Sequence, residues 1–177
     1  MPEASKSESG SMVIRMAKSI LVMSAALFAT LVAFNNITDY GSNFTFVRHV
    51  LSMDTTFPGN AGMWRSMTSN AAAHAAYIII IILEIIIAGL CWLGGLQLWK
   101  ARHDARLFSE AKSNAIIGLT LGIFLWFTGF IGVGGAWFLS WQSEDWNGLT
   151  ESARFTIIFT LFLIYLTLPE SLPSDLE

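Results

Sequence analysis

Four long apolar runs, separated by polar segments, set the pattern of this chain. No Asp, Glu, Lys or Arg occurs in residues 20–38 or 114–142, and the run 71–99 contains one, Glu84. An apolar stretch of about 20 residues is long enough to cross a hydrocarbon core of about 30 Å as an α-helix. We therefore expect an all-α membrane protein, a bundle of four transmembrane helices. The expected helices cover about residues 16–37, 71–99, 114–141 and 151–168.

These runs must be helices because the bilayer core contains no water. Each backbone N–H and C=O there has to bond within the protein, and a single long segment achieves this only as a helix. Transmembrane strands are about half as long as these runs. Pro169 follows the fourth run and ends its regular structure.

The two ends of the chain differ from the apolar runs. Residues 1–11, MPEASKSESGS, are polar and predict a disordered tail. Met12 is an alternative translation start, since the apolar pattern begins there. The transmembrane domain should cover residues 12–170, and 171–177 should form a C-terminal tail. We expect the first run to be retained as a helix, because it is longer than the core of a signal peptide and no A-x-A site follows it.

Composition supports a membrane location, and the basic residues indicate an orientation. Hydrophobic residues make up 54% of the chain and charged residues 13%, against about a quarter charged in soluble domains. The net charge is −3 and the Lys and Arg residues are dispersed, so we expect no nucleic-acid binding. Seven basic residues lie before the first helix or between the second and third, and three lie in the other two loops. The positive-inside rule then places both termini in the cytoplasm.

Glu84 stands out because it falls near the middle of the second helix, at the expected bilayer midplane. Ala88 and Cys91 share its helical face, so it should point toward the packed side of the helix. Because burial disfavours the charged form, we expect a neutral carboxyl group at about pH 7. The group either carries a proton or ligand, or joins helices through hydrogen bonds. The candidate partners at similar depth are Thr30, Thr128, Thr160 and Tyr165.

The third helix carries glycines at helical spacing. Small residues let transmembrane helices approach closely, so these glycines predict a packing seam in preference to a hinge or pore. The expected helix-packing residues are Gly118, Gly122, Gly129 and Gly132.

The first outer loop, 39–70, has helical periodicity in one part. Phe44, Val47 and Leu51 fall on one face of NFTFVRHVLSMD, which predicts a short amphipathic helix at the outer interface. An irregular loop is the alternative. As a helix, the segment would act as a lid or as a docking surface for another subunit. The docking candidates are Asn36, Asp39, Tyr40, Asn43, Arg48, His49, Asp54, Trp64 and Arg65.

The same loop carries a family resemblance. NNITDYGSNFTFVRHVLSMDTTFPG, followed by WRSM at 64–67, closely resembles the signature of the domain-of-unknown-function family 2165. Members of that family are predicted small integral membrane proteins of bacteria. The resemblance covers about residues 12–170 and implies a four-helix, multi-pass protein of the bacterial inner (plasma) membrane. It implies no activity.

Catalytic and cofactor motifs are absent from the sequence. The three histidines are scattered, Cys91 is the only cysteine, and no phosphate loop, nucleophile elbow or zinc-protease motif occurs. We therefore expect no enzyme activity, no metal and no cofactor. The main hypothesis is an accessory or structural subunit in the lipid bilayer that docks a membrane-protein partner or a second copy of itself. The alternative is a small oligomeric transporter or proton-coupled permease that uses Glu84.

Overall fold

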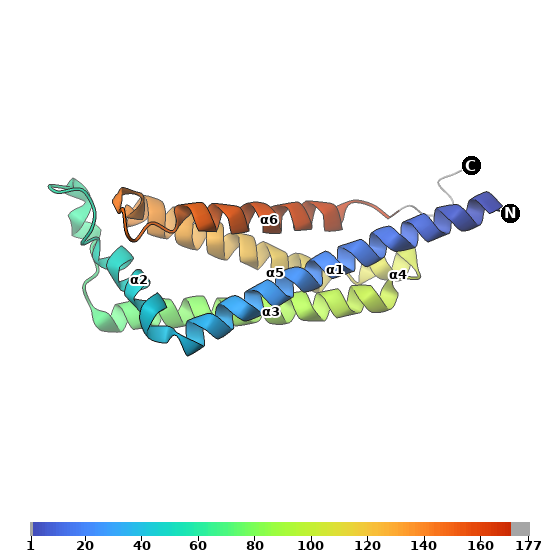
Figure 1. Cartoon of the computed structure of the whole chain (residues 1–177), viewed down its shortest axis with the longest axis horizontal. Coiled ribbons are helices and arrows are strands. Elements are labelled where there is room, and N and C mark those ends of the chain that lie inside the picture. The colour runs from blue at the N-terminus through green and yellow to red at the C-terminus, as the bar shows by residue number, and fades with distance from the viewer. Residues whose placement is uncertain (1, 171–177) are drawn as a thin grey trace.

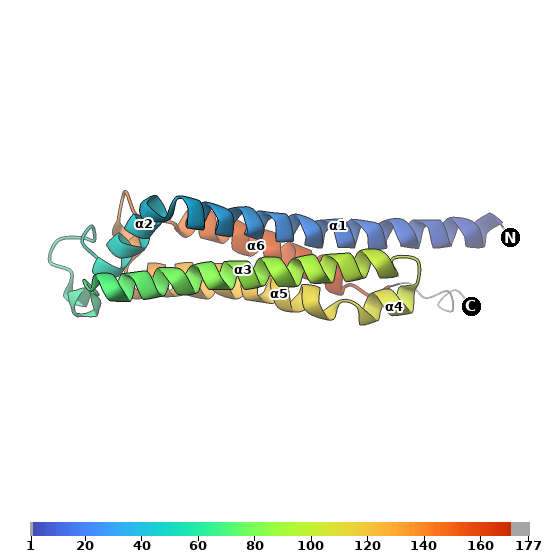
Figure 2. The same cartoon turned by 90° about the horizontal axis from the view of Figure 1, so that it is seen from below.

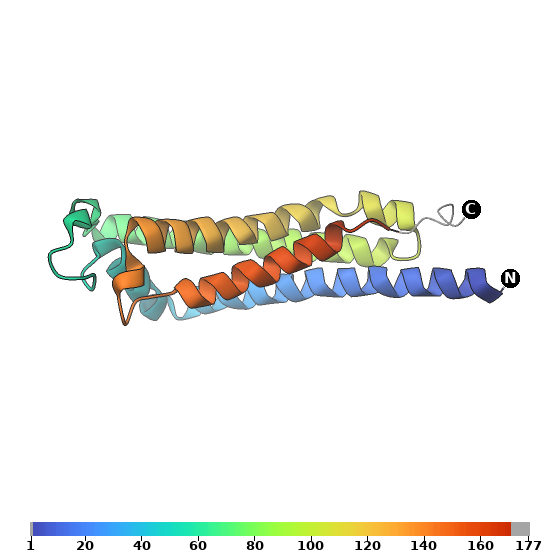
Figure 3. The same ribbon diagram turned by 90° about the horizontal axis from the view of Figure 1, so that it is seen from above.

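The computed structural model describes residues 2–170, with side chains from residue 10 onward, as a bundle of long helices (Figure 1). No strand occurs in this described part of the chain. α1 lies along α3, and α5 with η2 lies between α3 and α6 (Figures 2 and 3). In chain order the elements are α1 (Pro2–Thr38), α2 (Tyr40–Ser52), the 3₁₀-helix η1 (Ala61–Arg65), α3 (Asn70–Ala101), α4 (Ala105–Glu110), α5 (Ser113–Ile123), the π-helix η2 (Phe124–Trp137), the 3₁₀-helix η3 (Ser140–Gln142) and α6 (Leu149–Thr167).

Four helical segments are long and apolar enough to span a membrane, which confirms the expected four-helix transmembrane bundle. The start of α1 and the end of α6 lie at one end of the bundle, here called the terminal end (Figure 1). α2 and the segments 53–69 and 138–148 lie at the opposite end, here called the loop end. The orientation of the two ends in the membrane stays a prediction from the charge distribution. The four segments are Gly10–Thr38, Asn70–Ala101, Ala105–Trp137 and Leu149–Thr167.

α1 extends beyond its apolar run. It begins at Pro2, so residues 2–11, for which the sequence predicts a disordered tail, continue the helix. Elongating an existing helix gains one hydrogen bond per residue and is far easier than nucleating a new helix. A long apolar helix can therefore propagate into a polar segment. Residue 1 and the expected C-terminal tail, 171–177, lie outside the described residues.

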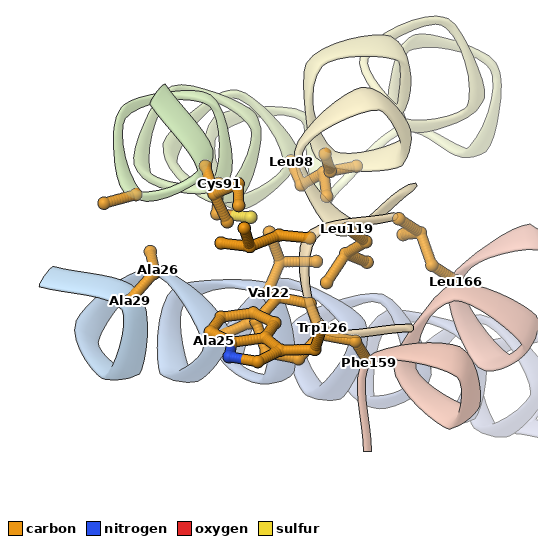
Figure 4. Packing of buried hydrophobic residues seen from close by; sticks show 14 of the residues in the cluster. Val22, Ala25, Ala26, Ala29, Cys91, Leu98, Leu119, Trp126, Phe159 and Leu166 are labelled. Atoms are coloured by element: carbon orange, nitrogen blue, oxygen red, sulfur yellow. The ribbon is translucent and has the colours of Figure 1, made fainter. Parts of the chain in front are cut away.

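Small side chains bring α1 and α3 together in the core. Ala25, Ala26 and Ala29 of α1 belong to the same buried cluster as Cys91 of α3 (Figure 4). Toward α6 the cluster contains larger side chains, including Phe159. Lipid tails are as apolar as these side chains, so close packing holds transmembrane helices together in place of a hydrophobic driving force.

Glycines permit the closest contacts between α5 and its neighbours. A Cβ on Gly94 of α3 would overlap the α5 backbone at Ala115. A Cβ on Gly118 of α5 would lie 2.7 Å from Sγ of Cys91, and one on Gly122 would overlap a phenylalanine ring of α6. At Gly118 and Gly122, α5 therefore packs closely on α3 and α6, respectively.

The second half of the third span is a π-helix, although the apolar run predicts one continuous helix of a single type. The Phe138 N–H donates to the Val133 carbonyl, five residues earlier, at 3.0 Å. A Cβ on Gly129 or Gly132 would meet only atoms of the same helix. The expected packing face of four glycines is therefore corrected to two, because bonding five residues back changes the angle between successive side chains.

Buried charged groups connect the helices at the terminal end. The Lys18 and Lys112 ammonium groups donate to Oε1 of Glu170 at 2.6 and 2.8 Å. Both also donate to the carbonyl of Leu168, at 2.8 and 3.2 Å. Lys18 is only 2% exposed. Removing one partner of such a buried pair leaves an uncompensated charge, which typically costs about 3–5 kcal/mol.

The orientation can be tested with single cysteines. Ser42→Cys and Glu144→Cys lie at exposed positions of the loop end, and Ser109→Cys lies at an exposed position of the terminal end. In intact spheroplasts an impermeant thiol reagent should label the first two and spare the third, as the positive-inside rule predicts. The native Cys91 is fully buried and should contribute little background. The reverse labelling pattern would overturn the orientation.

The close contact of α3 with α5 can be tested by adding one methyl group. Gly94→Ala should lower Tm in mild detergent, because the methyl group would overlap the α5 backbone. Gly89→Ala on the same helix is the matched control, since a Cβ there has nothing within 4 Å. Alanine also improves helix propensity over glycine by about 1 kcal/mol, so the control should melt at the same or a higher temperature. Equal Tm values for both variants would contradict the packing described here.

Candidate functional site

Glu84 lies on the buried face of α3, with 1% of its surface exposed. Tyr77, Ala88 and Cys91 on the same face are also buried, whereas Ile85 is 49% exposed. The face with small residues therefore points into the bundle, where the helical spacing predicts it. A carboxyl group buried in this way needs hydrogen-bonding partners from the protein itself.

The hydrogen-bonding partner of Glu84 is Asn36, two residues before the end of α1. Nδ2 of Asn36 donates to Oε1 at 2.9 Å and to Oε2 at 2.8 Å. The backbone carbonyl of Asn36 accepts a hydrogen bond from the Tyr77 hydroxyl at 3.0 Å. This carbonyl lies in the last turn of α1, whose carbonyls lack partners within the helix. α3 thus binds both the side chain and the backbone of Asn36.

The position of the Asn36–Glu84 pair along the bundle can be measured from the terminal end. Asn36 follows Lys18, which belongs to the charged cluster of the terminal end, by about 18 residues, or about 27 Å along α1. Within α3, Glu84 has 14 residues on its loop-end side (70–83) and 17 on its terminal side (85–101). The midplane position of Glu84 stays a prediction from the length of the second apolar run.

The partners expected for Glu84 from helix depth lie elsewhere. Nε1 of Trp92 donates to Oγ1 of Thr30 at 3.0 Å, so Thr30 is opposite a part of α3 about two turns from Glu84. The Tyr165 ring lies near the terminal end, with its centroid 5.8 Å from Nζ of Lys18. The sequence shows the length of each run but not how far one helix is shifted along another. None of the four predicted partners bonds to Glu84 in the described structure. They are Thr30, Thr128, Thr160 and Tyr165.

Aromatic side chains lead from this pair to the surface of the loop end. The rings of Tyr77 and Tyr40 are 4.8 Å apart, and the Tyr40 hydroxyl lies 2.7 Å from Nδ1 of His74. The Phe44 ring of α2 stacks on His74 with centroids 4.0 Å apart. Because His74 is exposed, this line of side chains extends from the surface to the buried Glu84.

The first loop forms an ordered cap over the loop end. α2 occupies the segment for which periodicity predicts a helix, and its residues Val47 and Leu51 are buried in a cluster with α3 side chains. Its apolar face therefore contacts protein. The Met67 N–H donates to the Leu51 carbonyl at 2.8 Å, and the Thr55 hydroxyl donates to Oγ of Ser143 at 2.7 Å. These bonds connect both ends of the loop to the remainder of the cap.

Trp64, Arg65 and Trp137 form an exposed group on this cap, here called the Trp–Arg–Trp group. The guanidinium carbon lies 5.5 Å from the Trp64 ring centroid and 5.0 Å from that of Trp137. Nη1 of Arg65 also donates to the Trp137 carbonyl at 3.0 Å. Trp64 is 74% exposed. The arginine therefore holds two tryptophans in place while much of their surface stays accessible.

The other docking candidates occupy different settings. Asn36 does not belong to the outer loop surface, because its amide bonds to Glu84; this corrects its assignment. Nδ1 of His49 lies 2.8 Å from Oδ2 of Asp54, and the imidazole stacks on Trp146 with centroids 4.5 Å apart. Tyr40 bonds to His74, as described above. Three further candidates take part in none of these side-chain pairs. Asn43 and Arg48 lie on α2, and Asp39 lies directly before it.

The Asn36–Glu84 pair can form hydrogen bonds in either protonation state of the carboxyl group. When Glu84 is ionised, the amide nitrogen of Asn36 donates to the carboxylate. When Glu84 is protonated, the Asn36 amide can rotate by half a turn, so that its oxygen accepts from the carboxyl O–H. The described residues contain no group of three or more His, Cys, Asp or Glu side chains placed to hold a metal ion. The hydrogen bonds of Asn36 to Glu84 and Tyr77 make the site suited to joining α1 with α3.

Sequence reasoning missed Asn36 as the partner of Glu84 and missed the shared contact of Lys18 and Lys112 with Glu170. One signal for Asn36 was present, because an amide at the end of an apolar helix is a suitable donor to a carboxyl group in the membrane. The two lysines served only as orientation signals in the sequence. Their convergence requires the interior of α1, the start of α5 and the segment after α6 to meet, which no local pattern reveals.

A double-mutant cycle tests the Asn36–Glu84 pair. Asn36→Leu should destabilise the bundle by about 1–3 kcal/mol, because it leaves the buried Glu84 carboxyl without its partner. Glu84→Leu should also destabilise it, because it leaves the half-buried Asn36 amide without its partner. The double variant should lose less stability than the sum of the two single losses, since neither polar group remains without a partner. Glu84→Gln can still bond to Asn36 and should keep a Tm close to that of the parent protein. Additive losses in detergent unfolding would contradict the pairing.

Comparison with known proteins agrees with the architecture and with the resemblance noted in the outer loop. Searches of curated proteins and of solved structures found no match. The profile of the family described as "Predicted small integral membrane protein (DUF2165)" matches residues 14–169, which is most of the chain. The chain therefore belongs to the DUF2165 family of predicted small integral membrane proteins.

Proposed function

We propose that the protein is a non-enzymatic accessory subunit of the bacterial inner membrane that docks a membrane-protein partner through its loop-end cap. The observation that supports this proposal most directly is the exposed Trp–Arg–Trp group on an ordered cap. Docking of this kind needs no catalytic residue, metal or cofactor from this chain.

Further apolar side chains extend the surface around this group. Phe57 and Trp141 are 54% and 51% exposed, and their rings are 5.6 Å apart. Met63, next to Trp64, is 43% exposed. Exposed apolar patches that contain tryptophan and arginine are typical of the residues that dominate protein–protein binding energies. The composition of this surface therefore suits a protein partner.

The position and rigidity of the cap favour protein contact over lipid contact alone. Tryptophans also gather at membrane boundaries, but the segment 53–69 projects past the ends of α3 and η2 (Figures 1 and 2). The Phe57 N–H donates to Oε1 of Gln142 at 3.0 Å, and the Ser66 hydroxyl donates to the Ser52 carbonyl at 2.7 Å. A loop that is already ordered loses little conformational entropy on docking.

Site-specific photocrosslinking tests the docking surface. A photoreactive amino acid at Trp64 should form a discrete protein adduct in cells, which mass spectrometry identifies. The same amino acid at Ile157, which is 58% exposed on the apolar helix α6, is the matched control and should label lipid. Arg65→Ala should weaken the Trp64 adduct, because the arginine positions both tryptophans.

The mass of the adduct distinguishes the possible partners. A second copy of this chain would identify the partner as the protein itself, and a different membrane protein would identify an accessory role. Lipid adducts alone at both Trp64 and Ile157 would contradict the docking proposal.

One observation favours the alternative of a small oligomeric transporter or proton-coupled permease. The side chains of His74, Tyr40 and Tyr77 lead from the surface toward Glu84, and an ionisable group inside a membrane is a natural proton carrier. Proton-coupled flux in proteoliposomes that is lost in a folded Glu84→Gln variant would support this function. Flux unchanged by the substitution would exclude Glu84 as the carrier.

A further inference from the structure

An apolar groove at the loop end is not used by the proposed docking surface. It lies between α2, α3 and η2 and has a volume of about 270 Å³, close to the lower end of the roughly 300–1,000 Å³ typical of ligand pockets. Its walls include Ile79 of α3 and Val133 of η2. These two side chains are 57% and 46% exposed on apolar helices. The groove is therefore continuous with the surface that faces lipid.

Two glycines keep this groove open. A Cβ on Gly134 would lie 3.7 Å from Val50 of α2, and one on Gly129 would lie 3.7 Å from Leu125 of its own helix. Both are ordinary van der Waals distances, so helix packing does not exclude a side chain at either position. Gly94 differs, because a Cβ there would overlap the neighbouring backbone. The missing side chains at Gly129 and Gly134 thus leave space in the groove instead of bringing helices together.

Ser140 is the one side chain in the lining that carries a polar group. It is 6% exposed, and its hydroxyl forms no hydrogen bond with other described residues. Leu139 before it has a φ of 57°, a strained conformation for a residue other than glycine. The resulting turn sets Phe138 and Ser140 against the same groove. Strained residues gather at binding sites, and the Ser140 hydroxyl, which is not among the buried unpaired atoms, is accessible to a ligand.

We propose that this groove binds one acyl chain of an ester-linked glycerolipid, with the Ser140 hydroxyl donating to the ester carbonyl. Water is a poor occupant of this groove. A buried water molecule needs about 2–4 polar partners, and the side chains that line the groove supply only one polar group. The bilayer supplies hydrocarbon chains directly at the open side of the groove. Ester groups lie where the hydrocarbon core meets the headgroups, which is the level at which the chain leaves the third span before Ser140.

Lipid binding to matched variants tests the groove. Delipidated protein in mild detergent receives dioleoyl phosphatidylethanolamine or its ether-linked analogue, and native mass spectrometry measures the bound lipid. Ala76→Phe places a ring in the groove, whose lining includes Ala76, and should abolish binding of both lipids. Ala75→Phe is the matched control, since Ala75 is exposed and lies outside the lining; it should bind like the parent protein.

The Ser140 contact has its own test. Ser140→Ala should weaken binding of the ester-linked lipid by up to about tenfold, the range for one neutral hydrogen bond, and should leave binding of the ether-linked lipid unchanged. This variant removes only an unpaired hydroxyl, so it should fold even if Ala76→Phe does not. Equal binding by Ala75→Phe and Ala76→Phe would overturn the groove as a lipid site. An unchanged preference for the ester-linked lipid in Ser140→Ala would overturn the ester contact.

Discussion

A polar group within hydrocarbon has no water to bond to, and the arrangement of these helices follows from the partners that such groups find in the chain. Near the loop end, Asn36 of α1 bonds to Glu84 of α3. At the terminal end, Lys18 and Lys112 converge on Glu170. The two sites lie about 27 Å apart along α1. Together they define how far α1 is shifted along its neighbours, because moving the helix by one turn would separate both sets of partners.

The glycines of this protein have two opposite effects on packing. At Gly94, Gly118 and Gly122 the absence of a Cβ lets helix backbones approach each other, and any larger residue would push them apart. At Gly129 and Gly134 the neighbouring atoms leave room for a side chain, and its absence creates space. Gly129 and Gly134 both lie in the π-helix η2, where Gly135 still packs closely on Leu149 of α6. π-Helical segments are frequent at functional sites.

The two ends of the bundle differ in what they offer to other molecules. At the terminal end, Arg15, Lys18 and Lys112 contact carbonyl and carboxylate oxygens within the protein, whereas Lys100 and Arg106 are exposed. The loop end instead exposes the Trp–Arg–Trp group and opens the apolar groove. These two features share the end of η2, because Trp137 belongs to the group and Phe138 lines the groove. A lipid in the groove would therefore contact the segment that supports the proposed docking surface.

The sequence by itself determined the four spans, the buried face of α3 around Glu84 and the helical part of the first loop. These features depend on the length and period of apolar residues, which are local properties of one segment. Only the tertiary structure decided that Asn36, rather than Thr30, bonds to Glu84, and that the glycines of the third span have different surroundings. Those features depend on the shift and rotation of one helix against another. Side-chain contacts from several helices set these quantities together, so no single segment encodes them.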